Sequence, residues 1–238
     1  MPAQGGVPGG TPDVGGAISW AFTKFGQNAG VLIALAAVVF VVQLIGFGVN
    51  NITQRGANTV SDCANLTGQA FTDCVGAGPA TIAGLGILSL IISIVFWVIG
   101  LLATIGLIRA ALKISRGEKP EFSDIWHPKH FWQYFLVALV FGICAGIGFV
   151  LCVIPGLFII WIWQFGQYEA LDKGPGVFAS LGKSYKMVMA NKGPAVVTLI
   201  VVFVASLVTI ITCGIGALVV LPFEVLFMAN MYRQFGNE

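Results

Sequence analysis

The sequence predicts an all-α membrane protein with six transmembrane helices, arranged as three hairpins that are each preceded by an interfacial segment or helix. Hydrophobic residues make up 57% of the chain and charged residues only 9%, whereas a soluble domain carries about 25% charged residues. Several apolar runs approach the ~20 residues that a helix needs to cross a bilayer. None of these runs alternates as transmembrane β-strands do, so the helical class follows.

Residues 1–12 are uncharged and rich in Gly and Pro, and we expect this tail to be disordered. Residues 13–238 are expected to form a single six-span helical domain. Its first helix has an apolar face, which is typical of a helix lying in the membrane interface or of an amphipathic helix packed over the bundle. That face consists of Val14, Ile18, Ala21, Phe22 and Phe25.

The first span is predicted at 30–49 and is followed by a polar outer loop at 50–79. This loop contains Cys63 and Cys74. Two cysteines in one loop on the oxidising side of a membrane favour a local disulfide that closes a small lobe. A metal site is less favoured there, because no His or further Cys lies nearby.

The second apolar run, 81–114, is predicted to be one tilted helix. Splitting it at Gly100 would place several basic residues on the outer side, against the positive-inside rule. Between this helix and the third span lie His127 and His130. An aromatic belt at the membrane interface explains this stretch better than a metal site, because no third ligand is evident.

The third span, 131–154, contains Gly142 and Gly146, followed by Gly148. Small residues at this spacing allow two helices to approach closely. We expect a turn at residues 155–156, which are Pro and Gly, and then a short fourth span at 157–171.

Residues 177–190 are predicted to form a surface helix with Lys183 and Lys186 facing anionic lipid headgroups. Its apolar face would consist of Phe178, Leu181, Tyr185, Val188 and Met189. The fifth and sixth spans are predicted at 194–213 and 216–232, joined by a minimal turn. With both termini in the cytoplasm, Arg55 alone of the twelve Lys and Arg residues would lie outside, as the positive-inside rule requires.

Glu224 is an acid within the sixth span, where an ionisable residue is costly and often functional. Counting inward from the outer ends of the spans places five polar side chains at a similar depth, roughly 10 to 12 Å. We predict that they form an intramembrane polar layer. Hydrogen bonding between helices is its simpler role, and a ligand or proton site is the alternative. The layer would consist of Glu224, Gln164, Gln43, Ser89 and Ser206.

Four short stretches at hairpin turns and helix ends carry a resemblance to a known family: 148–156 (GFVLCVIPG), 179–184 (ASLGKS), 191–194 (NKGP) and 213–216 (CGIG). Through them, residues 14–236 resemble a bacterial group of six-span membrane proteins. That group is similar to the membrane domain that precedes the catalytic domain in some glycerophosphodiester phosphodiesterases. The resemblance implies a multi-pass protein of the bacterial plasma membrane. It does not imply phosphodiesterase activity, because these 238 residues include no soluble catalytic domain.

We expect no catalytic, cofactor or metal site, because no nucleophile, base and acid share one depth in the spans. The expected function is that of a non-catalytic accessory, scaffold or assembly subunit of a larger membrane complex, for example a respiratory one. The alternative is a carrier or transporter of a lipid or small apolar molecule. Expected partners are the lipid bilayer and other membrane subunits, whereas a net charge of +2 gives no reason to expect nucleic acid.

Overall fold

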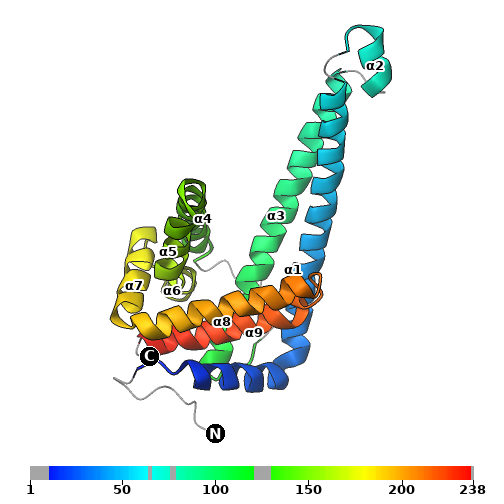
Figure 1. The fold of residues 1–238 in the computed structure, drawn as a ribbon. Helices are drawn as coiled ribbons and strands as arrows, with labels where there is room; N and C mark the ends of the chain where they lie inside the picture. Colours follow the sequence, from blue (N-terminus) through cyan, green and yellow to red (C-terminus); the bar gives the residue numbers. More distant parts are fainter. Residues whose placement is uncertain (1–10, 64–65, 76–78, 121–129, 237–238) are drawn as a thin grey trace. The chain divides into compact units, whose positions relative to one another are not determined.

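The computed structural model describes residues 11–63, 66–75, 79–120 and 130–236, and every regular element within them is an α-helix (Figure 1). This agrees with the predicted all-α class. The predicted disorder of residues 1–12 falls mostly outside the described part. The helices are α1 Val14–Asp62, α2 Gln69–Val75, α3 Pro79–Ser115, α4 Phe131–Leu151, α5 Val153–Trp163, α6 Gly166–Lys173, α7 Val177–Ala190, α8 Lys192–Ile211 and α9 Ala217–Gly236.

The chain divides into two compact units. One unit is built from the residues up to Ala36 together with those from Thr104 onward, and the other consists of Ala37–Ala103. Helices α1 and α3 each contribute to both units, whereas α4 to α9 belong wholly to the first. The candidate site described below lies entirely within the first unit.

Helix α1 has a kink at Asn28, whose backbone is non-helical at φ −124° and ψ 19°. The Asn28 side-chain amide donates a hydrogen bond to the Lys24 carbonyl oxygen (3.0 Å). This backbone carbonyl therefore keeps a hydrogen-bond donor next to the kink. Asp13 accepts a hydrogen bond from the Gly16 N–H (3.0 Å), as an N-cap residue does. The kink lies two residues before the predicted start of the first span at residue 30.

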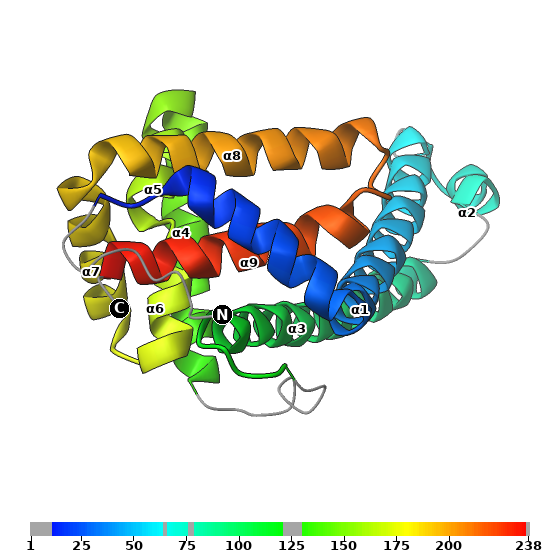
Figure 2. The same ribbon diagram turned by 90° about the horizontal axis from the view of Figure 1, so that it is seen from below.

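The part of α1 before the kink packs along α9 (Figure 2). The Asp13 N–H donates to Gln234 Oε1 (2.7 Å), and the Phe22 and Phe223 rings have centroids 4.5 Å apart, so the two helices run antiparallel. These contacts agree with a packed helix, and the position of this helix relative to the membrane interface stays a prediction. The predicted apolar face is only partly right, because Phe22 is exposed while Ala17 and Ala21 are fully buried.

The second unit contains the later part of α1 and the earlier part of α3. The polar stretch after Val49, expected to be a loop, instead continues α1 as helix to Asp62, and Gln69–Val75 forms α2. That expectation was wrong because polarity indicates contact with water, and a helix continues in water as readily as a loop. Helix α3 is unbroken, as predicted. A Cβ on Gly100 would lie 3.4 Å from Val42 Cγ1, so α1 and α3 pack together within this unit.

Helices α4 and α5 are joined by one extended residue, Cys152 (φ −171°, ψ 152°). The predicted turn at Pro155 is therefore misplaced: Pro155 lies in the first turn of α5, where its missing N–H has no intrahelical partner to lose. The two helices approach closely at Gly148, because a Cβ there would lie 2.8 Å from Gly156 Cα. Close packing was also predicted at Gly142 and Gly146, but a Cβ on either would meet no described atom within 4 Å.

The predicted fourth span is broken. Helix α5 ends at Trp163 and α6 begins at Gly166, so two short helices occupy the range expected to be one. Helix α6 ends at Gly174, which has a left-handed backbone (φ 64°) that Gly adopts without a Cβ penalty. Helix α7 has the predicted bounds. A small core of Val137, Ala170 and Leu181 joins α4, α6 and α7.

Helices α8 and α9 are joined by a tight turn. Its Cys213 and Gly214 have left-handed backbones, with φ 52° and 88°, and Thr212 Oγ1 accepts a hydrogen bond from the Gly216 N–H (2.9 Å). Pro222 lies inside α9 and removes one intrahelical hydrogen bond there.

Among the described residues, four helical segments are long and apolar enough to cross a membrane. The membrane class is therefore supported. The count of six crossings and the cytoplasmic position of both termini remain predictions, because the ranges of the fourth and sixth predicted spans are not among these four. The four segments are Val14–Val49, Ile91–Ser115, Phe131–Leu151 and Lys192–Ile211.

Candidate functional site

A partly buried ionic cluster lies where α3, α6, α7 and α9 meet. We call it the Glu169 cluster, and it consists of Arg116, Glu169, Asp172, Lys183 and Tyr232. Its two acids lie three residues apart on α6, so they share one face of that helix. Glu169 is 2% exposed, and a buried carboxylate requires partners for its charge.

Both oxygens of Glu169 have partners. Oε1 accepts a hydrogen bond from Lys183 Nζ of α7 (3.0 Å), and Oε2 accepts one from the Tyr232 hydroxyl of α9 (2.6 Å). The Lys183 side chain is 37% exposed, so the cation lies at the edge of the protein with the carboxylate beneath it. The cost of burying Glu169 is thus offset by one cation and one neutral donor from two other helices.

Asp172 extends the cluster to α3. Its carboxylate pairs with the Arg116 guanidinium, and its Oδ2 lies 3.3 Å from the Tyr232 hydroxyl oxygen. Tyr232 has a single hydroxyl proton, and the shorter distance favours donation of that proton to Glu169. Arg233, next in the chain, donates to the Ser115 carbonyl oxygen at the end of α3. The cluster therefore fastens four helices to one another.

Ser184 of α7 holds the break between α5 and α6. Its hydroxyl donates to the Ile162 carbonyl oxygen (3.0 Å) and accepts from the Phe165 N–H (3.2 Å). Ser184 is fully buried, so these bonds satisfy two backbone groups that would otherwise lack partners in an apolar setting. The break is thus stabilised by the protein itself.

Tyr168 lies beside the Glu169 cluster and close enough to Glu224 for a charge interaction. The rings of Tyr168 and Tyr232 stack with centroids 6.2 Å apart, and Tyr168 lies within electrostatic range of the Glu224 carboxylate. Glu224 itself is half-buried on α9. It therefore lies at the edge of the packed region, on the same helix as Tyr232.

The five residues of the predicted polar layer belong to both units, and each is described within its own unit. The Gln164 amide donates to the Ala195 carbonyl oxygen (3.4 Å), and the exposed Ser206 donates to Val202 of its own helix (3.0 Å). Gln43 and Ser89 belong to the second unit, and the Ser89 side chain lies outside the described part. Among the described side chains, no hydrogen bond joins two of these five residues, so the layer remains a prediction.

The predicted pairing of Cys63 with Cys74 also remains a prediction. Cys63 is 1% exposed, and the Cys74 side chain lies outside the described part. Cys144, Cys152 and Cys213 are free thiols, and the last two are exposed at the α4–α5 and α8–α9 turns.

Among the described residues, no three His, Cys, Asp or Glu side chains gather as they would around a metal ion. His127 of the weighed His127–His130 pair lies outside that part of the chain.

Glu169 and Asp172 directly follow an apolar run of the sequence. Two acids three apart, directly after such a run, are a signal that could have marked the cluster. Their partners Arg116 and Tyr232 lie 56 to 63 residues away in the chain, and no local pattern connects them.

Comparison with known proteins gives relatives but no function. The chain is 26% identical over 226 residues to a protein of Mycobacterium bovis and to proteins of two Mycobacterium tuberculosis strains, each described as uncharacterized. The matches cover 93% of this chain and 68% of each relative. No family model matches, and no solved structure is significantly similar. The resemblance to the membrane domain of glycerophosphodiester phosphodiesterases therefore stays an expectation.

Proposed function

We propose that this chain is a non-catalytic, multi-pass protein of the bacterial plasma membrane that serves as an accessory, scaffold or assembly subunit of a larger membrane complex. The observation that carries this proposal is the Glu169 cluster. Both Glu169 oxygens are engaged by neighbouring helices, and Asp172 pairs with Arg116. Charged groups engaged in this way hold the fold together, which supports a structural role.

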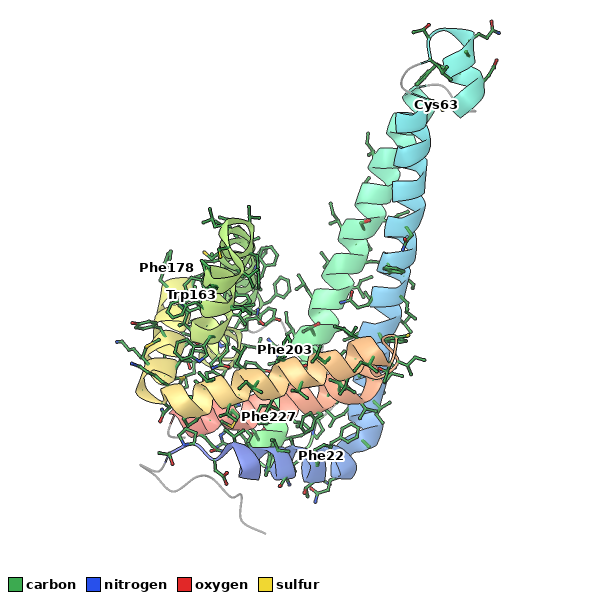
Figure 3. The ribbon with its side chains drawn as sticks, in the orientation of Figure 1. Phe22, Cys63, Trp163, Phe178, Phe203 and Phe227 are labelled. Atoms are coloured by element: carbon green, nitrogen blue, oxygen red, sulfur yellow. The ribbon has the colours of Figure 1, made fainter. Side chains whose placement is uncertain are left out.

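The apolar surface of the candidate spans further supports the proposal. Only 11% of the apolar window of α8 is buried inside the chain, and Phe203 on this helix is 60% exposed (Figure 3). On α4, Gly142 and Gly146 leave open space for another backbone, which small residues permit between membrane helices. Such faces suit contacts with lipid and with the helices of partner subunits.

We further propose six crossings with both termini in the cytoplasm. In this arrangement α5 and α6 together form the fourth crossing and α9 the sixth. The support comes from the basic residues, of which Arg55 alone would lie outside. The segment containing Cys63 would then face the oxidising side, where a disulfide with Cys74 is stable. Alkylation of the protein with and without prior reduction, followed by intact mass measurement, tests that disulfide.

Purification in mild detergent followed by mass spectrometry tests the accessory function. We expect stoichiometric recovery with other membrane subunits. A Gly146→Leu variant should lose those subunits while keeping its own thermal stability, because a Cβ at this position meets no described atom. Recovery of a monodisperse monomer or homodimer, without other proteins, would contradict the proposal.

A carrier of a lipid or small apolar molecule is the second candidate, and Glu224 is the observation that favours it. This half-buried acid lies in an otherwise apolar stretch of α9 within electrostatic range of Tyr168. The broken fourth span does not add support, because in transporters such breaks leave backbone groups for the substrate, whereas Ser184 occupies them here. A Glu224→Gln variant that loses co-purified lipid would favour the carrier; one that keeps both lipid and subunits would favour the accessory function.

A further inference from the structure

Helix α7 presents one face to the protein and two different faces away from it. Successive residues of an α-helix are rotated by about 100°, which groups the side chains of α7 into three sectors roughly a third of a turn apart. The first sector is buried against the other helices of its unit. It consists of Ser180, Leu181, Ser184, Met187 and Val188.

The second sector is apolar and aromatic. Phe178 is 84% exposed and Tyr185 is 46% exposed, and Met189 lies on the same side of the helix, one turn after Tyr185. Figure 3 shows Phe178 at the upper end of α7. Large aromatic side chains in this position are unfavourable in water, so an apolar medium is the setting that suits this sector.

The third sector is small and cationic. Ala179, Lys186 and Ala190 are exposed there, and Lys183 lies at its border with the buried sector. That border position explains why Lys183 reaches Glu169, with 3.0 Å between Nζ and Oε1. Helix α7 contains no acidic residue, so its exposed surface carries a net positive charge from Lys186.

We propose that α7 binds the lipid surface through these two outer sectors. Phe178 and Tyr185 contact acyl chains, and Lys186 contacts the phosphate of an anionic headgroup. An interfacial helix has this division into an apolar strip and a bordering cationic strip, and the positive charge complements anionic lipid. This inference goes beyond the accessory function and does not depend on it.

The assignment differs from the one expected from sequence in two respects. Lys183 is engaged by Glu169, so Lys186 is the lysine that contacts lipid. Leu181 and Val188 are 3% and 0% exposed, so they stabilise the fold and cannot enter the acyl layer.

Photo-crosslinking of the full chain in lipid nanodiscs tests the apolar sector. A benzoylphenylalanine at position 178 should form adducts with phospholipid acyl chains. The same group at Ala179, one residue along and in the cationic sector, is the matched control and should form several-fold fewer. Adducts with a polypeptide at position 178, or equal yields at the two positions, would overturn the proposal.

Lipid composition tests the cationic sector. In nanodiscs that mix phosphatidylglycerol with phosphatidylcholine, the crosslinked adducts at position 178 should be enriched in phosphatidylglycerol. The Lys186→Gln change should lower this enrichment about fivefold, the effect of one basic residue at an anionic surface. The Lys183→Gln change should leave the enrichment in place while lowering thermal stability. Unchanged enrichment in Lys186→Gln, or an equal loss in both variants, would contradict the assignment.

Discussion

Tyr232 brings one hydroxyl group to two carboxylates in a region closed to solvent. The side chain is 1% exposed, and its hydroxyl lies 2.6 Å from Glu169 and 3.3 Å from Asp172. A hydrogen bond to a charged group contributes about 1.5–3 kcal/mol to stability. Because the hydroxyl comes from α9 and the acids from α6, this contribution stabilises the contact between those helices.

The Tyr232→Phe change should therefore lower the free energy of unfolding in detergent by about 1.5–3 kcal/mol. The ring stacking with Tyr168 would remain, so the loss would report the hydroxyl group alone. Tyr185→Phe is the matched control, because Tyr185 is 46% exposed, and it should change stability by less than about 0.5 kcal/mol. A Tyr232→Phe chain as stable as the Tyr185→Phe control would show that the Tyr232 hydroxyl contributes no measurable stability.

The Ser184 hydroxyl has two backbone groups as hydrogen-bond partners, whereas the Tyr232 hydroxyl has two carboxylates. Replacing Ser184 by Ala would leave the Phe165 N–H and the Ile162 carbonyl without this partner. We expect a loss of about 1–3 kcal/mol in the free energy of unfolding. Ser206→Ala removes a serine that is exposed and bonded within its own helix, and denaturation of this control should match the parent chain. A Ser184→Ala chain as stable as that control would show that the break needs no support from α7.

Some of these residues are conspicuous in the sequence, but the sequence does not predict which groups they contact. Glu169 and Asp172 stand out because they end an apolar run, and Glu224 because it interrupts one. Depth counting grouped Glu224 with Gln164, but the Gln164 amide bonds to Ala195 of α8. Depth gives one coordinate, whereas a contact also depends on the direction in which each side chain points, and that follows from packing between distant segments.

At the scale of elements, the α4–α5 hairpin depends on two glycines. A Cβ on Gly148 would lie 2.8 Å from Gly156 Cα, and one on Gly156 would lie 2.7 Å from the Phe149 ring. Atoms at such separations must move apart, and the nearest atom to Gly148 is backbone. The hairpin therefore tolerates no side chain at Gly148 without separation of its helices.

Gly148→Ala should destabilise the chain by about 1–3 kcal/mol, the cost of overpacking a closely packed contact. Gly146→Ala, two residues earlier on the same helix, should have no such cost, because its Cβ meets no described atom; the gain in helix propensity could add up to about 1 kcal/mol. Thermal unfolding of the two variants in one detergent compares them directly. The account of this hairpin fails if both variants have the same stability.

Helix positions followed from sequence more reliably than the turns between them. The bounds of α7 agree with the prediction because Gly and Pro flank an amphipathic run. The turn before α5 was misplaced because Pro155 is compatible with a first helical turn. The break at Gln164 gave no local signal, because it depends on Ser184, which lies on another helix.

At the scale of the whole molecule, the number of crossings decides where the Glu169 cluster lies. With six crossings and the termini inside, the cluster faces the cytoplasm, and so do the lysines of α7. With only the four segments named above crossing, α5, α6 and α7 would lie on the outer side, separated from Arg116 and Tyr232, whose contacts with α6 could then not form. The two arrangements place the α8–α9 turn on opposite sides of the membrane.

Labelling of Cys213 in intact cells with a membrane-impermeant maleimide distinguishes these arrangements most directly. Cys152 and Cys213 are exposed free thiols at the two turns, and the Cys152→Ser and Cys213→Ser variants assign the labelled site. Six crossings predict that both cysteines react from outside. Reaction of Cys152 alone, with Cys213 reacting only after permeabilisation, would contradict six crossings and the cytoplasmic position of the cluster.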